Sequence, residues 1–133
     1  MIISIATEND FDWLSRNDLH LLPSTLHKKI ANAEIYIARD LVPLAWLRFG
    51  LFWDNLPFMN MLYVLEAHRR LGVGTALTLY WEQEMRKAGH ACVLTSTLAN
   101  EDAQHFYRKN GYVDIGSFVL LGEASELILR KTL

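Results

Sequence analysis

The sequence of 133 residues has little of what several protein classes require. Its one cysteine, Cys92, cannot form an internal disulfide, and its five histidines show no spacing typical of a zinc site. The formal net charge of −2 gives no electrostatic case for nucleic-acid binding. The uncharged stretches, such as residues 55–65, are far shorter than the roughly 20 residues of a membrane helix. Residues 1–5 lack the basic segment of a signal peptide, so we expect a cytoplasmic protein without metal, membrane or nucleic acid.

What the sequence does have is a composition typical of one globular domain. Hydrophobic residues make up 51% of the chain and charged residues 21%. A chain of this length buries roughly two-thirds of its unfolded surface, enough for a core without disulfides. No repeat, low-complexity segment or linker interrupts the sequence, so we expect residues 1–133 to form a single domain.

Hydrophobic periodicity predicts a mixed order of strands and helices. The predicted strands are residues 2–6, 34–39, 42–52, 57–65, 91–97, 112–120 and 125–130, and the predicted helices are residues 7–17, 22–31, 75–87 and 100–110. The order β-α-α-β-β-β-α-β-α-β-β favours an α/β (α+β) fold with a mixed central sheet of about 6–7 strands. The run 57–65 has neither charge nor alternation, which is typical of a central strand covered on both faces.

Two glycines, Gly72 and Gly74, lie between a predicted strand and a predicted helix, just after Arg69 and Arg70. Glycines let the backbone approach a ligand closely, and the first N–H groups of a helix are unpaired donors. With the helix dipole and the arginines, these donors would suit a diphosphate, although the glycines could simply turn the chain. No Gly-Lys-Ser/Thr follows, which excludes a Walker P-loop, and the third glycine of a dinucleotide fold is missing.

A second group of residues lies on the predicted helix 100–110. Phe106 and Tyr107 are expected on the same face as Ala103. In the simplest interpretation Asn100 caps the helix and the aromatic residues belong to the core. That interpretation does not exclude a function, because a capping asparagine and a half-buried tyrosine can also contact a ligand.

Together these motifs resemble the GNAT superfamily of acyl-CoA N-acyltransferases. The resemblance covers about half of the chain, and the expected element order of the rest agrees with that family's fold. In combination the pattern is specific: Leu62-Tyr63-Val64, then Arg69-x-x-Gly72-x-Gly74, then Asn100 and Phe106-Tyr107-x-x-Asn110-Gly111-Tyr112.

The resemblance implies transfer of an acyl group, most simply acetyl, from acetyl-CoA to a primary amine by direct attack in a ternary complex, without a metal. The fourth strand would splay from the fifth, and the acyl-CoA would lie between them. The backbone of Tyr63, Val64 and Leu65 would bind pantetheine and the acyl carbonyl, residues 70–75 the pyrophosphate, and Asn100 the pantetheine arm. The cofactor-binding residues implied are Tyr63, Val64, Leu65, Arg69, Arg70, Leu71, Gly72, Val73, Gly74, Thr75, Asn100 and Tyr107.

Tyr107, expected near the thioester sulfur, is the implied catalytic residue. A phenol titrates near ~10 and a thiol near ~8.5, so full proton transfer to the leaving thiolate is uphill by roughly 2 kcal/mol. Either Tyr107 only hydrogen-bonds the thiolate, or the site lowers its pKa. Several members of the family also place a glutamate on the fourth or fifth strand. Here residues 56–65 hold no carboxylate, so we expect water relayed by strand carbonyls or hydroxyls to deprotonate the amine.

The acceptor is expected to be a small-molecule or peptide amine, selected by the N-terminal helices and the turn at residues 53–55. Aromatic and acidic residues there suit a cation, although they could equally be core and solvated surface: Phe11, Trp13, Phe52, Trp53, Phe58, Asp10, Asp12, Asp18 and Asp54.

Two other functions stay open, an acyl-CoA-binding module or sensor without turnover and a βαβ nucleotide binder. Family members often form homodimers, and the apolar residues 118–121 could supply such an interface or one core face.

Overall fold

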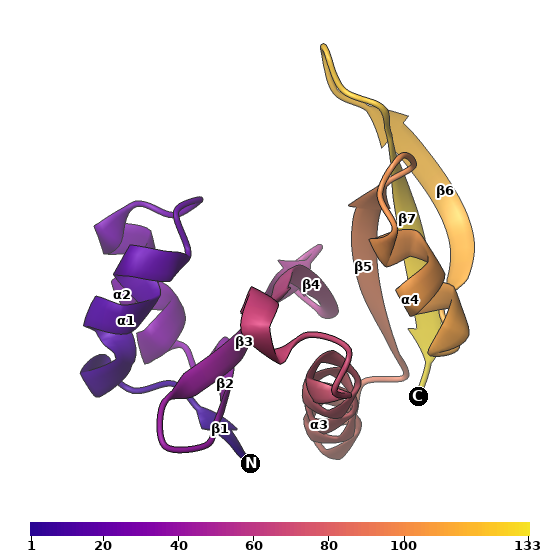
Figure 1. The fold of residues 1–133 in the computed structure, drawn as a ribbon. Coiled ribbons are helices and arrows are strands. Elements are labelled where there is room, and N and C mark those ends of the chain that lie inside the picture. The colour runs from indigo at the N-terminus through magenta and orange to yellow at the C-terminus, as the bar shows by residue number, and fades with distance from the viewer. The chain divides into compact units, whose positions relative to one another are not determined.

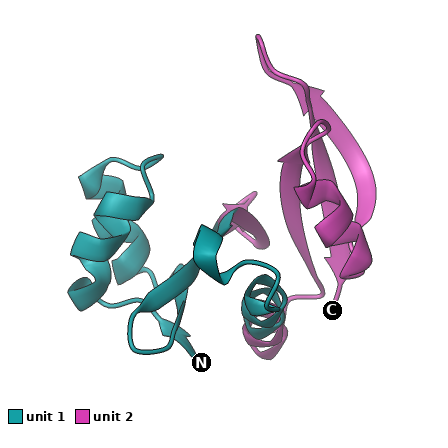
Figure 2. Cartoon of the chain, viewed as in Figure 1, with its two compact units in different colours: residues 1–49, 61–80 teal, residues 50–60, 81–133 magenta.

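A computed structural model, which describes residues 1–133, divides the chain into two compact units. Unit 1 comprises residues 1–49 and 61–80, and unit 2 comprises residues 50–60 and 81–133 (Figure 2). Three elements contribute residues to both units: β3 (Pro43–Phe52), β4 (Leu56–Val64) and α3 (Val73–Lys87). The expectation of a single domain stays a prediction.

The predicted element order is confirmed, with seven strands and four α-helices (Figure 1). The other strands are β1 (Ile2–Ile5), β2 (Ile35–Arg39), β5 (Cys92–Leu98), β6 (Val113–Val119) and β7 (Ser125–Thr132). The other helices are α1 (Phe11–Asn17), α2 (Pro23–Ala31) and α4 (Ala103–Lys109), with short 3-10 turns η1 (Glu8–Asp10) and η2 (Glu66–His68).

The strands form one mixed sheet in the order β1-β2-β3-β4-β5-β7-β6. Strand β4 pairs with β5 in parallel, joining Phe58 to Leu94 and Met59 to Thr95. The β1–β2, β2–β3, β5–β7 and β6–β7 pairs are antiparallel. This confirms the mixed α/β fold, and the splay of β4 from β5 stays a prediction.

In unit 1, α1 and α2 lie side by side and share a core with the first strands (Figure 1). Leu26 and Ile30, one helical turn apart on α2, are both buried. A buried charged pair lies at the C-terminal end of α1, where Arg48 Nε donates to Asp18 Oδ2 at 2.8 Å. The hydrophobic cluster consists of Ala6, Leu14, Leu26, Ile30, Ile35, Ile37 and Trp46.

Helix α3 starts at Val73, two residues before the predicted start. Gly72 has a φ of +81°, and its carbonyl accepts the Ala76 N–H at 3.0 Å, which begins the helical ladder. One side of α3 is apolar and buried at Leu77, Trp81 and Met85.

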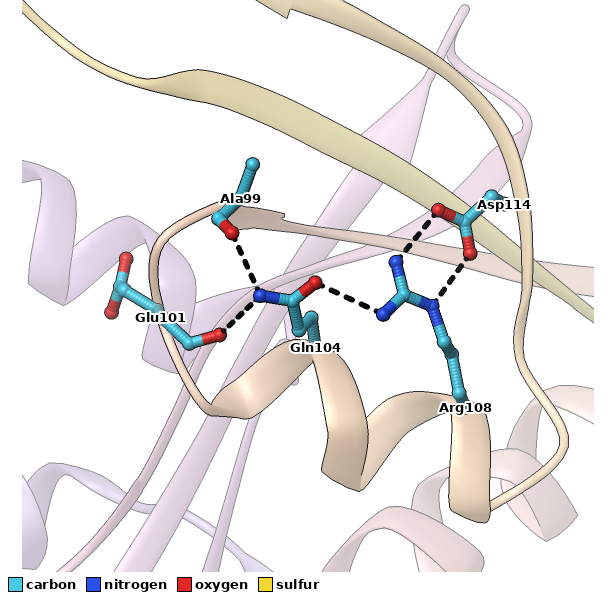
Figure 3. Close-up of polar contacts among 5 residues, drawn as sticks. All are labelled: Ala99, Glu101, Gln104, Arg108 and Asp114. Carbon is cyan, nitrogen blue, oxygen red and sulfur yellow. Dashed lines mark hydrogen bonds and ion pairs between the residues drawn. The ribbon is translucent and has the colours of Figure 1, made fainter.

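In unit 2, α4 packs against β5 and is shorter than predicted (Figure 1). The prediction that the helix begins at Asn100 is wrong, because residues 99–102 form a turn and Asp102 occupies the N-cap. Gln104 explains the late start: its side-chain amide donates to the carbonyls of Ala99 at 2.8 Å and Glu101 at 2.9 Å (Figure 3). These bonds stabilise the turn in competition with helix.

Two expectations about burial are wrong. Strand β4 is central in the sheet but is not covered on both faces, because Asn60 and Tyr63 are exposed. The apolar residues 118–121 do not form a core face, since Phe118 is 43% exposed and Leu121 fully exposed. Residues 118 and 119 end β6, and residues 120 and 121 follow it. Strand β6 lies at the edge of the sheet and therefore lacks a neighbouring strand on one side. The homodimer expected from this run stays a prediction.

None of the helices has the length and apolar character needed to cross a membrane.

Candidate functional site

The turn between η2 and α3 in unit 1 carries the predicted diphosphate site. Arg70 has a φ of +62° and Gly72 a φ of +81°, so the chain turns sharply before α3. The backbone N–H groups of residues 70–75 have no hydrogen-bond partner within the protein; the first N–H of this segment to have one is that of Ala76. Residues 69–72 are exposed. The turn therefore presents a row of unpaired donors at the positive end of a 15-residue helix.

Arg69 holds this turn against the end of β4. Its Nε donates to the Val64 carbonyl at 2.8 Å, and its guanidinium lies 5.1 Å from the centre of the Tyr63 ring. Tyr63 in turn stacks on Trp46, with ring centres 4.9 Å apart. Arg69 therefore has structural contacts beside its expected role toward phosphate, whereas Arg70 is exposed.

The backbone groups expected to bind pantetheine are partly occupied. The Leu65 N–H donates to the Leu44 carbonyl at 2.9 Å, so this donor is used within the protein. The Val64 carbonyl accepts from Arg69 but has a second lone pair for a ligand. The assignment of Tyr63, Val64 and Leu65 to pantetheine stays a prediction.

Tyr107 lies on α4 in unit 2 and is 7% exposed. Its hydroxyl donates to Met59 Sδ at 3.8 Å, and Thr95, whose Oγ donates to the Met59 carbonyl, lies on the neighbouring strand β5. Burial raises the pKa of Tyr107, a hydrogen bond with Thr95 opposes the rise, and the charge of Glu101 adds to it. The idea that the site lowers this pKa is therefore wrong. Tyr107 keeps its proton at neutral pH and acts as a hydrogen-bond donor.

No carboxylate lies on either strand expected to supply a base. Strands β4 and β5 contain no Asp or Glu, and Glu66 and Asp54, which flank β4, are exposed. Thr95 and Thr97 on β5 are buried. Asn100, expected on the pantetheine arm, is exposed in the turn before α4.

Two of the acidic residues considered for acceptor binding already form ion pairs within the protein. Asp10 accepts from Arg39 at 2.9 Å, and Asp18, which is 2% exposed, is paired with Arg48. A carboxylate that already pairs with an arginine, here the half-buried Arg39 or the buried Arg48, is not free to bind a cationic amine. Their proposed role in acceptor binding is therefore wrong, and Trp13, packed edge-on against Trp46, belongs to the core.

The aromatic residues of the β3–β4 turn in unit 2 are exposed instead. Phe52 is 46% and Trp53 76% exposed, with ring centres 5.0 Å apart. Phe58 is half-buried, 6.2 Å from Phe52. The exposed Asp54 adjoins them, so this turn keeps the aromatic and acidic character predicted for it.

The sequence reasoning missed a buried carboxylate. Glu82 on α3 is 2% exposed, accepts the Tyr112 hydroxyl at 3.0 Å and pairs with Lys131 Nζ at 2.6 Å. A signal was available, because Glu82 lies three residues before Met85 and so shares the buried side of α3.

No group of three or more His, Cys, Asp or Glu side chains could hold a metal ion.

Comparison with known proteins agrees with these observations. An acetyltransferase (GNAT) domain model matches residues 31–114. A GNAT-family acetyltransferase from Bacillus cereus ATCC 10987 is 21% identical, with a TM-score of 0.80 over 98% of this chain and 96% of that chain. A ribosomal-protein-alanine N-acetyltransferase from Brucella melitensis is 18% identical, with a TM-score of 0.83 over 100% of both chains.

An aminoglycoside 6′-N-acetyltransferase crystallised with coenzyme A is also 18% identical, with a TM-score of 0.78 over 99% of this chain and 97% of that chain. At these identities the likeness shows the fold. No curated protein matches the chain. The family model, however, spans more than half of the sequence, and the chain belongs to the GNAT acetyltransferase family.

Proposed function

We propose that this protein transfers an acyl group, most simply acetyl, from acyl-CoA to a primary amine by direct attack in a ternary complex. The observation that carries the proposal is the row of unpaired N–H groups at residues 70–75. A diphosphate offers the acceptor oxygens and negative charge that a helix N-terminus favours. The exposed Arg70 adds a positive charge beside them.

Tyr107 is proposed to act on the sulfur of the thioester. The amine nitrogen attacks the thioester carbonyl carbon, the carbon–sulfur bond breaks, and the sulfur leaves as a thiolate. Because burial raises the pKa of Tyr107, proton transfer to a thiolate of pKa near ~8.5 is unfavourable. The hydroxyl therefore donates a hydrogen bond that strengthens as charge develops on sulfur, and solvent supplies the final proton.

The missing strand carboxylate bears on the acceptor. At pH 7, neutralising a lysine-like amine of pKa ~10.4 costs about 4.6 kcal/mol, whereas an α-amine near ~7.8 costs about 1 kcal/mol. Without a carboxylate base, a water relayed by strand carbonyls or hydroxyls removes the proton, and an α-amine is the easier acceptor. The names of the structural neighbours include both a protein-alanine and an aminoglycoside acetyltransferase, so a peptide or a small molecule fits the family.

The same missing carboxylate favours a second candidate function, an acyl-CoA-binding module or sensor that does not turn over. Both candidates predict binding of CoA, and only the first predicts release of free thiol.

The two are separated by incubating the protein with acetyl-CoA and a panel of peptide α-amines, aminoglycosides, lysine and polyamines. The first proposal expects free CoA thiol together with an acceptor heavier by one acetyl group. Calorimetric binding of CoA without thiol release supports the binding module. A protein that binds no CoA contradicts both.

A further inference from the structure

We propose that Tyr112, Glu82 and Lys131 form a buried positioning network that fixes the Tyr107 ring for acyl transfer. The proposal rests on the function proposed above, in which Tyr107 faces the leaving sulfur. All four residues belong to unit 2.

The end of α4 ties Tyr112 directly to Tyr107. The Gly111 N–H donates to the Arg108 carbonyl at 3.1 Å, and the Tyr112 N–H donates to the Tyr107 carbonyl at 3.0 Å. This pair of bonds, with a φ of +93° at Gly111, is a Schellman motif. The two tyrosine rings also meet edge to face, with centres 5.6 Å apart and planes at 65°. A movement of Tyr112 therefore moves both the backbone and the ring of Tyr107.

Tyr112 is anchored in turn to two elements outside α4. Its hydroxyl donates to Glu82 Oε2 at 3.0 Å, and Lys131 Nζ donates to Glu82 Oε1 at 2.6 Å. Glu82 comes from α3 and Lys131 from β7. The Glu82 carboxylate is 2% exposed, and a buried charge without a partner is costly. This cost stabilises the hydrogen bonds that its two oxygens accept from Tyr112 and Lys131. Burial and the Glu82 charge raise the pKa of Tyr112, which keeps its hydroxyl a donor.

The contact between the Tyr107 hydroxyl and Met59 is too weak to fix the ring by itself. Its partner Met59 Sδ is a weak acceptor and lies 3.8 Å away. A hydrogen bond with Thr95 also holds this hydroxyl, and the Phe106 ring lies 5.3 Å from that of Tyr107, but only the helix end and Tyr112 link the ring to Glu82 and Lys131.

Helix α4 also carries an exposed tether, which provides a matched control. Arg108, next to Tyr107, donates twice to Asp114 at 2.9 Å and once to Gln104 (Figure 3). The Asp114→Asn variant weakens this exposed tether and leaves the buried network intact. If the buried network only kept α4 in place, Asp114→Asn would lower kcat as much as loss of the buried network does.

The test compares Tyr112→Phe, Glu82→Gln and Asp114→Asn by thiol release from acetyl-CoA. Tyr112→Phe keeps the ring and removes only its hydroxyl, so we expect kcat to fall about 10-fold with little change in KM for acetyl-CoA. Glu82→Gln, which changes the other side of the same bond, is expected to act in the same direction. Asp114→Asn is expected to keep the kcat of the unchanged protein.

A double variant distinguishes positioning from a merely structural role. If Tyr112 acts through Tyr107, the Tyr107→Phe/Tyr112→Phe variant is no slower than Tyr107→Phe alone. Losses that multiply, or an Asp114→Asn variant as slow as Tyr112→Phe, overturn the proposal.

A measurement without turnover separates this proposal from the proposed function. In protein labelled with ¹³C on tyrosine rings, the Tyr107 signal is identified by its absence in Tyr107→Phe. We expect it to shift in Tyr112→Phe and stay in place in Asp114→Asn. An unmoved signal in Tyr112→Phe contradicts the positioning. Absence of thiol release from the unchanged protein contradicts the proposed function, while the signal still decides whether Tyr112 fixes the ring.

Discussion

Replacing Tyr107 by phenylalanine removes one hydroxyl from a buried site while keeping the aromatic ring. In the resting protein this hydroxyl donates to Met59 Sδ at 3.8 Å, a long contact to a weak acceptor. The hydroxyl also has a hydrogen bond with Thr95, so its loss should cost about 1 kcal/mol of folding free energy. During acyl transfer the same hydroxyl would face a developing thiolate in a site that is 7% exposed, where its contribution is larger.

A hydrogen bond to a charged group contributes about 1.5–3 kcal/mol, which corresponds to roughly 10- to 160-fold in rate. A preorganised donor aimed at developing charge in a buried site can contribute up to about 1,000-fold, so we expect kcat to fall about 10- to 1,000-fold. The assay is thiol release at saturating acetyl-CoA, with the melting temperature measured alongside. Because burial raises the pKa of Tyr107 above its ordinary value of 10.0, Tyr107 itself causes no loss of activity below about pH 10. An unchanged kcat would remove Tyr107 from the chemistry.

Three further outcomes follow from the structure. Gly72→Val places a β-branched residue at a φ of +81°, a backbone conformation that strains it although nothing crowds the Cβ, so CoA should bind about 10-fold more weakly by calorimetry. The control Gly72→Asn tolerates this backbone and should bind CoA normally. Equal binding by both variants would contradict the role of the turn. Asp18→Asn leaves Arg48 buried without its counter-charge and should cost about 3–5 kcal/mol, or about 10–20 °C in melting temperature; an unchanged melting temperature would refute this. Peptide α-amines should outcompete polyamines as acceptors at pH 7, and the reverse order would contradict deprotonation by water.

Much of the fold is predictable from the sequence because local patterns and tertiary packing agree. Strand β2 is rich in isoleucine and tyrosine and pairs with β3 in a hairpin. Helix α3 has apolar residues at helical spacing and is followed by Gly89, whose φ is +94°. The glycine turn could also be located, because a strand, two glycines and a helix follow one another. Its unpaired N–H groups are a consequence of helix geometry.

Two of the errors have a common physical origin in polar side chains that bond to groups distant in the sequence. In the sequence Asp18 has the surroundings of a solvent-exposed acid, but in the structure it pairs with Arg48, which is 30 residues away. Glu82 needs Lys131, which is 49 residues away, and no local pattern reports that contact. The late start of α4 has a local cause, since Gln104 competes for carbonyls of the preceding turn, but helix propensity does not include such bonds.

The most direct test of the account follows the amides of residues 70–75 by NMR while ¹⁵N-labelled protein is titrated with CoA. We predict that these amides shift first and furthest, and that pantetheine, which lacks the diphosphate, moves them much less. CoA that binds while these amides keep their positions would contradict the assignment of the turn to the diphosphate.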